Sequence, residues 1–202
     1  MKATYKYSII CLLSIQFGHS QVFEIGDYIN DLVGNVCENG DDWKFSLDEN
    51  KKVLFISSFA TWWKPCQSEA QTIEEIYKQF KDKDVEVIGA GIDWNQPYSC
   101  KEWAKKFRLT FPILDDSKGR QIYNYFGDGI VPYNVVIDRS GRLIYSSSGF
   151  KKEDIVNAIE SGLKTPKTDT VYLKKKKPKA HHKTNYQTLR KKKGYNQFNS
   201  LF

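Results

Sequence analysis

A strand that runs directly into a proline-opened helix constrains the fold of this chain more than any other feature. Residues 53–56, Val-Leu-Phe-Ile, are β-branched and aromatic, which is typical of a buried strand. Pro65 suits the first turn of a helix because its missing N–H would have no partner there. Cys66 is expected on the helix face that packs on the sheet, because apolar residues follow it at helical spacing, at Ala70, Ile73, Ile76, Tyr77 and Phe80.

The sequence that follows continues an α/β pattern. A second apolar run at 85–92 predicts a strand parallel to the first, reached by a right-handed crossover. Residues 132–138 and 142–147 predict an antiparallel hairpin around a turn at 138–141. We expect an α/β domain with a four-stranded mixed central sheet and helices on both faces, the helices spanning residues 65–80, 100–107, 119–126 and 152–163.

Three local signals refine this pattern. Val36-Cys37 and residues 43–47 predict two short strands around a turn at 39–42. Ser99, with Glu102 three residues later, predicts a capping box at the start of the helix 100–107. The last helix should bury its apolar positions, Ile155, Val156, Ile159 and Leu163.

Three separated segments resemble the TlpA/ResA group of thioredoxin-like proteins. Residues 59–62 (Phe-Ala-Thr-Trp), 64–66 (Lys-Pro-Cys) and Glu69 are similar to the motif F-x-A-T-W-C-x-P-C-x-x-E, without the residue between Phe and Ala. Residues 111–115 are similar to the group's F-P-x-x-D segment, and Pro132 occupies the place of its cis-proline. The resemblance covers residues 36–163 and implies a thioredoxin fold and thiol–disulfide oxidoreductase chemistry.

Trp63 is the important departure from the family pattern. The family has its first cysteine at this position, where the helix N-terminus lowers the thiol pKa and makes it the attacking thiolate. Tryptophan cannot attack a disulfide, so the local disulfide with Cys66 cannot form. The family's proline shortly after the motif is also absent, with Gln71 in its place.

Cys66 and Glu69 are the candidate catalytic residues, and each has a structural alternative. Cys66 is either the reactive thiol, favoured by the first helical turn, or an inert cysteine that packs as a small apolar residue. In the resembling proteins a glutamate at the position of Glu69 helps to handle protons. It can equally be a solvent-facing charge favoured by the helix dipole.

The remaining site residues concern binding and pairing. The resemblance implies that Val131, before Pro132, offers backbone groups to an extended peptide, although a proline can also simply open an edge strand. Trp62 and Trp63 are expected at the surface, the alternative being that Trp62 is part of the core and Trp63 only caps the helix. Cys37 and Cys100 leave the pairing open. They can form a structural bridge, Cys100 can join Cys66 in a peroxiredoxin-like centre, or they can stay unpaired.

The two ends of the chain differ in composition from the domain. Residues 1–20 carry a basic start and a short apolar run, which predicts a signal peptide and export to the periplasm, the cell envelope or the medium. No transmembrane segment is expected after its removal. Residues 21–35 are a lead-in. Residues 164–202 hold a surplus of eleven positive charges in a chain of net charge +7, and are expected to be disordered and to attract an anionic envelope surface.

Three functional hypotheses follow from these features. The first is thiol–disulfide exchange through Cys66, with another cysteine resolving, or a peroxidase that uses Cys66 and Cys100. The second is a binding module that holds protein thiols or extended peptides without redox chemistry, and the third places the function in the tail. No cofactor, no specific nucleic-acid partner and no metal site is expected, since His181 and His182 lack a ligand framework.

Overall fold

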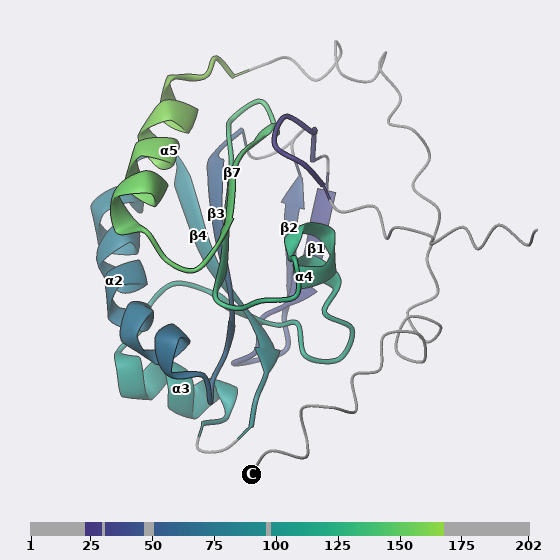
Figure 1. Cartoon of the computed structure of the whole chain (residues 1–202), viewed down its shortest axis with the longest axis vertical. Coiled ribbons are helices and arrows are strands. Elements are labelled where there is room, and N and C mark those ends of the chain that lie inside the picture. The colour runs from purple at the N-terminus through teal and green to yellow at the C-terminus, as the bar shows by residue number, and fades with distance from the viewer. Residues whose placement is uncertain (1–22, 30, 47–50, 96–97, 168–202) are drawn as a thin grey trace, which may run out of the picture.

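The computed structural model describes residues 23–29, 31–46, 51–95 and 98–167. They form a five-stranded mixed sheet and a separate two-stranded hairpin (Figure 1). The sheet order is β5-β4-β3-β6-β7, with β3 parallel to β4 and antiparallel to β6. Its strands are β3 Val53–Ala60, β4 Val85–Asp93, β5 Ile113–Asp115, β6 Tyr133–Ile137 and β7 Leu143–Ser148.

Side chains alternate between two apolar layers on opposite faces of this sheet. Leu54 and Ile56 of β3 pack toward the hairpin and the helix α4 Gln121–Phe126. Val53 and Phe55, one residue out of phase, contribute to the layer under the other helices, which are α2 Lys64–Phe80, α3 Cys100–Phe107 and α5 Lys152–Lys164. Figure 1 shows α2, α3 and α5 on one side and α4 with the hairpin on the other. Helices on both faces were predicted and are confirmed.

The sheet has one strand more than the sequence pattern predicted. Residues 111–115 were matched to a family segment, and their last three form β5, which pairs in parallel with β4 through Gly89 and Ile113. A three-residue strand after a proline is too short to show a period of its own. The strand forms through its pairing with β4. The prediction of a four-stranded central sheet was therefore wrong.

The N-terminal hairpin also begins earlier than predicted. Its strands are β1 Asp31–Asn35 and β2 Asp42–Ser46. Val36 and Cys37 were expected in the first strand, but they turn to the edge of the main sheet. Val36 bridges Leu114, and the Cys37 N–H donates to the Ile113 carbonyl with an N···O distance of 2.8 Å. Leu47, expected at the end of the second strand, lies outside the described residues.

Several local predictions are confirmed. Glu102 and Ser99 form a reciprocal capping box at the start of α3. The Val131–Pro132 peptide bond is cis. α5 buries Ile155 and Ile159 fully and two further apolar side chains partly, those of Val156 and Leu163. The predicted signal peptide, 1–20, lies outside the described residues, as does the tail beyond Lys167.

Candidate functional site

The turn between β3 and α2 is built by hydrogen bonds to the end of β4. All eight residues of β3 are buried, so the chain leaves the sheet in a fixed direction. Thr61, also buried, donates its hydroxyl to the carbonyls of Asp93 (3.3 Å) and Asn95 (3.0 Å). The Gln67 side-chain amide of α2 donates to the Thr61 carbonyl at 2.9 Å. These contacts fix the direction in which the first turn of α2 starts.

Trp62 and Trp63 lie on the surface at this turn, as expected. Each side chain is 42% exposed, and their rings meet edge to face at 5.8 Å. Trp62 is oriented by its indole N–H, which donates to an Asp93 carboxylate oxygen at 3.2 Å. Trp63 is the N-cap residue of α2 and makes no side-chain capping bond. An exposed indole therefore occupies the place where the resembling family has its attacking thiol.

Cys66 is the free cysteine of the described residues, and it is buried, with an exposed fraction of 2%. The pKa of its thiol is raised to about 12, mainly by burial; backbone hydrogen bonds at Ala60 and Cys66 oppose this rise, and the nearby Glu69 charge adds to it. At pH 7 a thiol with this pKa is ionised to a fraction on the order of one in 10⁵. Burial thus outweighs the helix N-terminus and favours the inert alternative for Cys66.

Glu69 lies one turn further along α2 and is half-buried rather than turned to solvent. Its Oε2 is buried and has no hydrogen-bond partner among the described residues. Burial raises the pKa of Glu69 to about 7. The group therefore changes charge near neutral pH, next to a thiol that does not.

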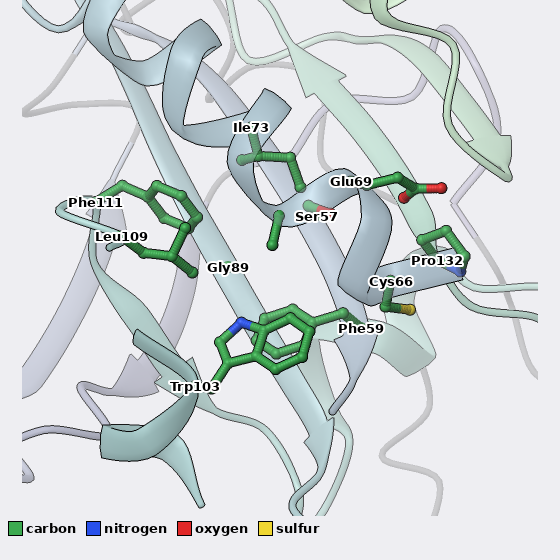
Figure 2. Close-up of a pocket in the computed structure, with 11 residues that line it drawn as sticks. Ser57, Phe59, Cys66, Glu69, Ile73, Gly89, Trp103, Leu109, Phe111 and Pro132 are labelled. Atoms are coloured by element: carbon green, nitrogen blue, oxygen red, sulfur yellow. The ribbon is translucent and has the colours of Figure 1, made fainter. Parts of the chain in front are cut away.

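A small cavity joins these residues to the proline loop. It has a volume of about 10 Å³, which is room for about one water molecule. Figure 2 shows Cys66, Glu69, Ser57 and Pro132 around it, with Trp103 of α3 closing one side. Ser57 was not predicted from sequence, and its hydroxyl also lacks a partner among the described residues. The one sequence signal for Ser57 was its position on a buried strand that leads into the motif.

The proline loop presents free backbone and an apolar side chain. Pro132 is buried, whereas Val131 is half-buried and Ile130 is 59% exposed. Tyr123 holds the loop, because its hydroxyl donates to the Ile130 carbonyl at 3.1 Å and accepts from the Gly129 N–H at 2.9 Å. The N–H and C=O of Val131 make no hydrogen bond within the described part of the chain. Ile130 and Tyr123 were not predicted from the sequence. The only sequence signal for them was their closeness to Pro132.

The structure resolves the cysteine pairing that the sequence left open. Cys37 and Cys100 form a disulfide, with Cα atoms 6.2 Å apart and a sequence separation of 63. Cys100 is therefore not joined to Cys66, as a peroxiredoxin-like centre of these two residues would require. Among the described residues, no group of three His, Cys, Asp or Glu side chains is placed to hold a metal ion. In the same residues no helix is long and apolar enough to cross a bilayer.

The curated proteins that this chain resembles include thiol–disulfide oxidoreductases. It is 31% identical over 115 residues to the thiol-disulfide oxidoreductase ResA of Geobacillus thermodenitrificans, covering 56% of this chain and 65% of that protein. This chain thus spans just under two thirds of that relative. The Bacillus cereus ResA is 31% identical over 134 residues, covering 66% of this chain and 75% of that protein.

Solved structures agree on the architecture. A Chlorobium tepidum protein described as the thiol:disulfide interchange protein DsbE superposes with a TM-score of 0.60 at 22% identity, covering 69% of this chain and 98% of that one. Such identity shows the thioredoxin-like fold alone. A family model matches residues 25–146, which is more than half of the sequence. The chain is a thioredoxin-fold protein related to the ResA thiol–disulfide oxidoreductases, and it belongs to the AhpC/TSA family.

Proposed function

We propose that this protein binds extended segments of partner proteins beside the proline loop, without disulfide exchange at the start of α2. The observation that carries the proposal is the contrast at the motif. Trp63, exposed, stands where the family has its attacking thiol, and Cys66, buried, keeps its proton. These two positions support binding of a partner without a reactive thiolate at the start of α2.

The backbone at Val131 is suited to an extended ligand. Its N–H and C=O are unpaired within the described residues, and an extended peptide can pair with such groups as an added strand does. Trp62, Trp63 and Ile130 offer exposed apolar side chains at the β3–α2 turn and in the proline loop. Backbone pairing would supply affinity at Val131, and the tryptophans would select apolar side chains in the partner.

A redox role for Cys66 has weaker support. Its pKa, about 12, lies about five pH units above that of Glu69, about 7, so Glu69 would not hold the Cys66 proton at neutral pH. The cavity-lining residues include no cationic side chain that could stabilise a thiolate. The same argument weighs against a peroxidase, which needs an ionised thiol. Family membership keeps exchange with protein thiols as the second candidate function.

Peptide binding can be tested with matched variants. An array of unstructured peptides would identify a binder, whose affinity is then measured by calorimetry. We expect Trp63→Ala to weaken binding at least tenfold, while Val33→Ala, which removes an apolar side chain 47% exposed on β1, leaves it unchanged. Methylation of successive peptide nitrogens should locate the residue that faces Val131. Equal affinity for native protein and Trp63→Ala would refute the proposal.

An insulin-reduction assay distinguishes the second candidate. Binding without exchange predicts that native protein leaves insulin disulfides intact at a concentration where a two-cysteine thioredoxin reduces them. Reduction by native protein, lost in Cys66→Ala, would favour exchange at Cys66 and contradict the proposal.

We further propose export and a surface role for the tail. The basic start and apolar run of residues 1–20 support export to the periplasm, cell envelope or medium. The positive surplus from Lys164 onward supports attraction to an anionic envelope surface.

A further inference from the structure

The Cys37–Cys100 disulfide lies outside the motif inherited from the family, and its two halves differ electrostatically. Cys100 is the first residue of α3, whose eight residues begin with the Ser99 capping box. The helix dipole stabilises a thiolate at that position. Cys37 lies in the loop after β1, where no helix begins. An acidic residue lies near each cysteine, Glu102 in the first turn of α3 and Glu38 beside Cys37, so the helix N-terminus is the difference between them. Cys100 is therefore the better leaving group of the pair.

Both cysteines are also more accessible than Cys66. Each is half-buried, packed at the margin of the apolar layer that encloses Cys66. A disulfide at a margin can be reached by an attacking thiolate, whereas one sealed in a core cannot. Within the described residues, this bridge is the one cysteine pair able to cycle between dithiol and disulfide.

The bridge is linked to the surface proposed for partner binding. Thr61 donates hydrogen bonds to Asp93 and Asn95, and Trp62 donates one to Asp93. Asp93 and Asn95 begin the segment that leads to Cys100. Asn95 lies five residues before Cys100. Five residues span at most about 18 Å. One turn beyond Cys100, Trp103 stacks on Phe59 of β3 with ring centroids 5.0 Å apart. Contacts of β3 and the turn after it thus involve both the segment before Cys100 and the helix that begins with it.

We propose that the Cys37–Cys100 disulfide is a redox centre that accepts two electrons from a partner protein with two thiols. A partner thiolate attacks the Cys37 sulfur, forms a mixed disulfide with it, and displaces Cys100 as a thiolate. The second partner thiol, after losing its proton to solvent, attacks the partner sulfur of that mixed disulfide and releases Cys37. The partner leaves with a disulfide, and Cys37 and Cys100 remain as a dithiol. This activity goes beyond the proposed peptide binding and does not use Cys66.

The experiment uses native protein in buffers of defined glutathione to glutathione-disulfide ratio. Samples are quenched with acid, free thiols are blocked with a maleimide, and peptides are mapped by mass spectrometry, while circular dichroism monitors folding. We expect the Cys37–Cys100 bridge to open across the buffer series in folded protein, with the glutathione mixed disulfide on Cys37. Cys66 should stay unmodified until the protein is denatured.

A second measurement tests the assigned roles. In reduced, folded protein at pH 7, iodoacetamide should alkylate Cys100 about tenfold faster than Cys37, because the N-terminus of α3 favours the thiolate form of Cys100. A bridge that stays closed under a hundredfold excess of glutathione until urea unfolds the protein would be structural, and would overturn the proposal. A mixed disulfide on Cys66, or equal alkylation of the two thiols, would also overturn it. None of these readouts depends on peptide binding, so the two proposals fail separately.

Discussion

Trp63 and Cys66 lie one helical turn apart at the start of α2, yet the first is 42% exposed and the second only 2%. In the resembling family these two positions hold the exchanging cysteine pair. Here the exposed member has lost its sulfur, and the member that keeps its sulfur is closed off from solvent. This contrast sets the first prediction.

Trp63→Cys should create a motif disulfide with Cys66 and raise insulin reduction well above that of the native protein. The introduced thiol would lie at the helix N-terminus, where its pKa is lowered. Because Trp63 is partly exposed, its truncation should cost less than the roughly 3–5 kcal/mol of a buried tryptophan. Trp63→Ser serves as the control without sulfur. A folded variant that forms the disulfide yet reduces no insulin would show that the groove has diverged.

Glu69→Gln should change the pH dependence of stability. Because burial raises the pKa of Glu69 from 4.5 to about 7, its stabilising contribution is full below pH 4.5 and is lost as pH rises through 7. Relative to the native protein, the variant's free energy of unfolding should therefore rise by about 1–2 kcal/mol between pH 4.5 and pH 8. This range allows for the half-exposure of Glu69. Urea unfolding at both pH values measures this, and an equal difference at both would contradict it.

Two neighbouring glutamates on α2 provide a matched pair. Glu74 is 5% exposed and accepts hydrogen bonds from the Thr110 N–H and hydroxyl, both at 2.7 Å. Glu74→Ala leaves the Thr110 N–H without this partner and should cost about 2–4 kcal/mol. Glu75→Ala breaks only an exposed pair with Lys152 and should cost less than about 1 kcal/mol. If chemical denaturation shows similar losses of unfolding free energy for both variants, the hydrogen bonds from Thr110 contribute little to stability.

Export predicts a mature protein that begins near Gln21. The basic residues and short apolar run of the first twenty residues are the basis for this expectation. N-terminal sequencing of protein recovered outside the cytoplasm measures it directly. Mature protein that retains Met1 would contradict it.

The basic tail predicts salt-dependent binding to anionic vesicles. The surplus of eleven positive charges from Lys164 onward should attract anionic phospholipid, and the attraction should weaken above roughly 0.15 M salt. Sedimentation with vesicles would compare the full chain with one that ends at Lys164. Equal binding by both chains would exclude the tail as the contact.

Local patterns in the sequence determined much of the fold. The path from β3 through Pro65 into α2, the capping box of Ser99 and Glu102, and the hairpin of β6 and β7 each depend on residues close together in sequence. Spacing and turn chemistry record such interactions directly, so they could be predicted. The exposed place of Trp62 and Trp63 was expected from the resemblance to the family.

Only the tertiary structure decided the chemistry of the site. Cys37 and Cys100 are 63 residues apart, and no sequence spacing distinguishes their pairing from the alternatives. The β5 strand depends on pairing with β4, and Val36 and Cys37 lie outside β1 because they pair with the distant residues Leu114 and Ile113. The pKa values of Cys66 and Glu69 are raised mainly by burial, and both residues line one cavity together with Phe59, Trp103 and Pro132. Desolvation is a property of everything that surrounds a group, and those surroundings come together only when the chain has folded.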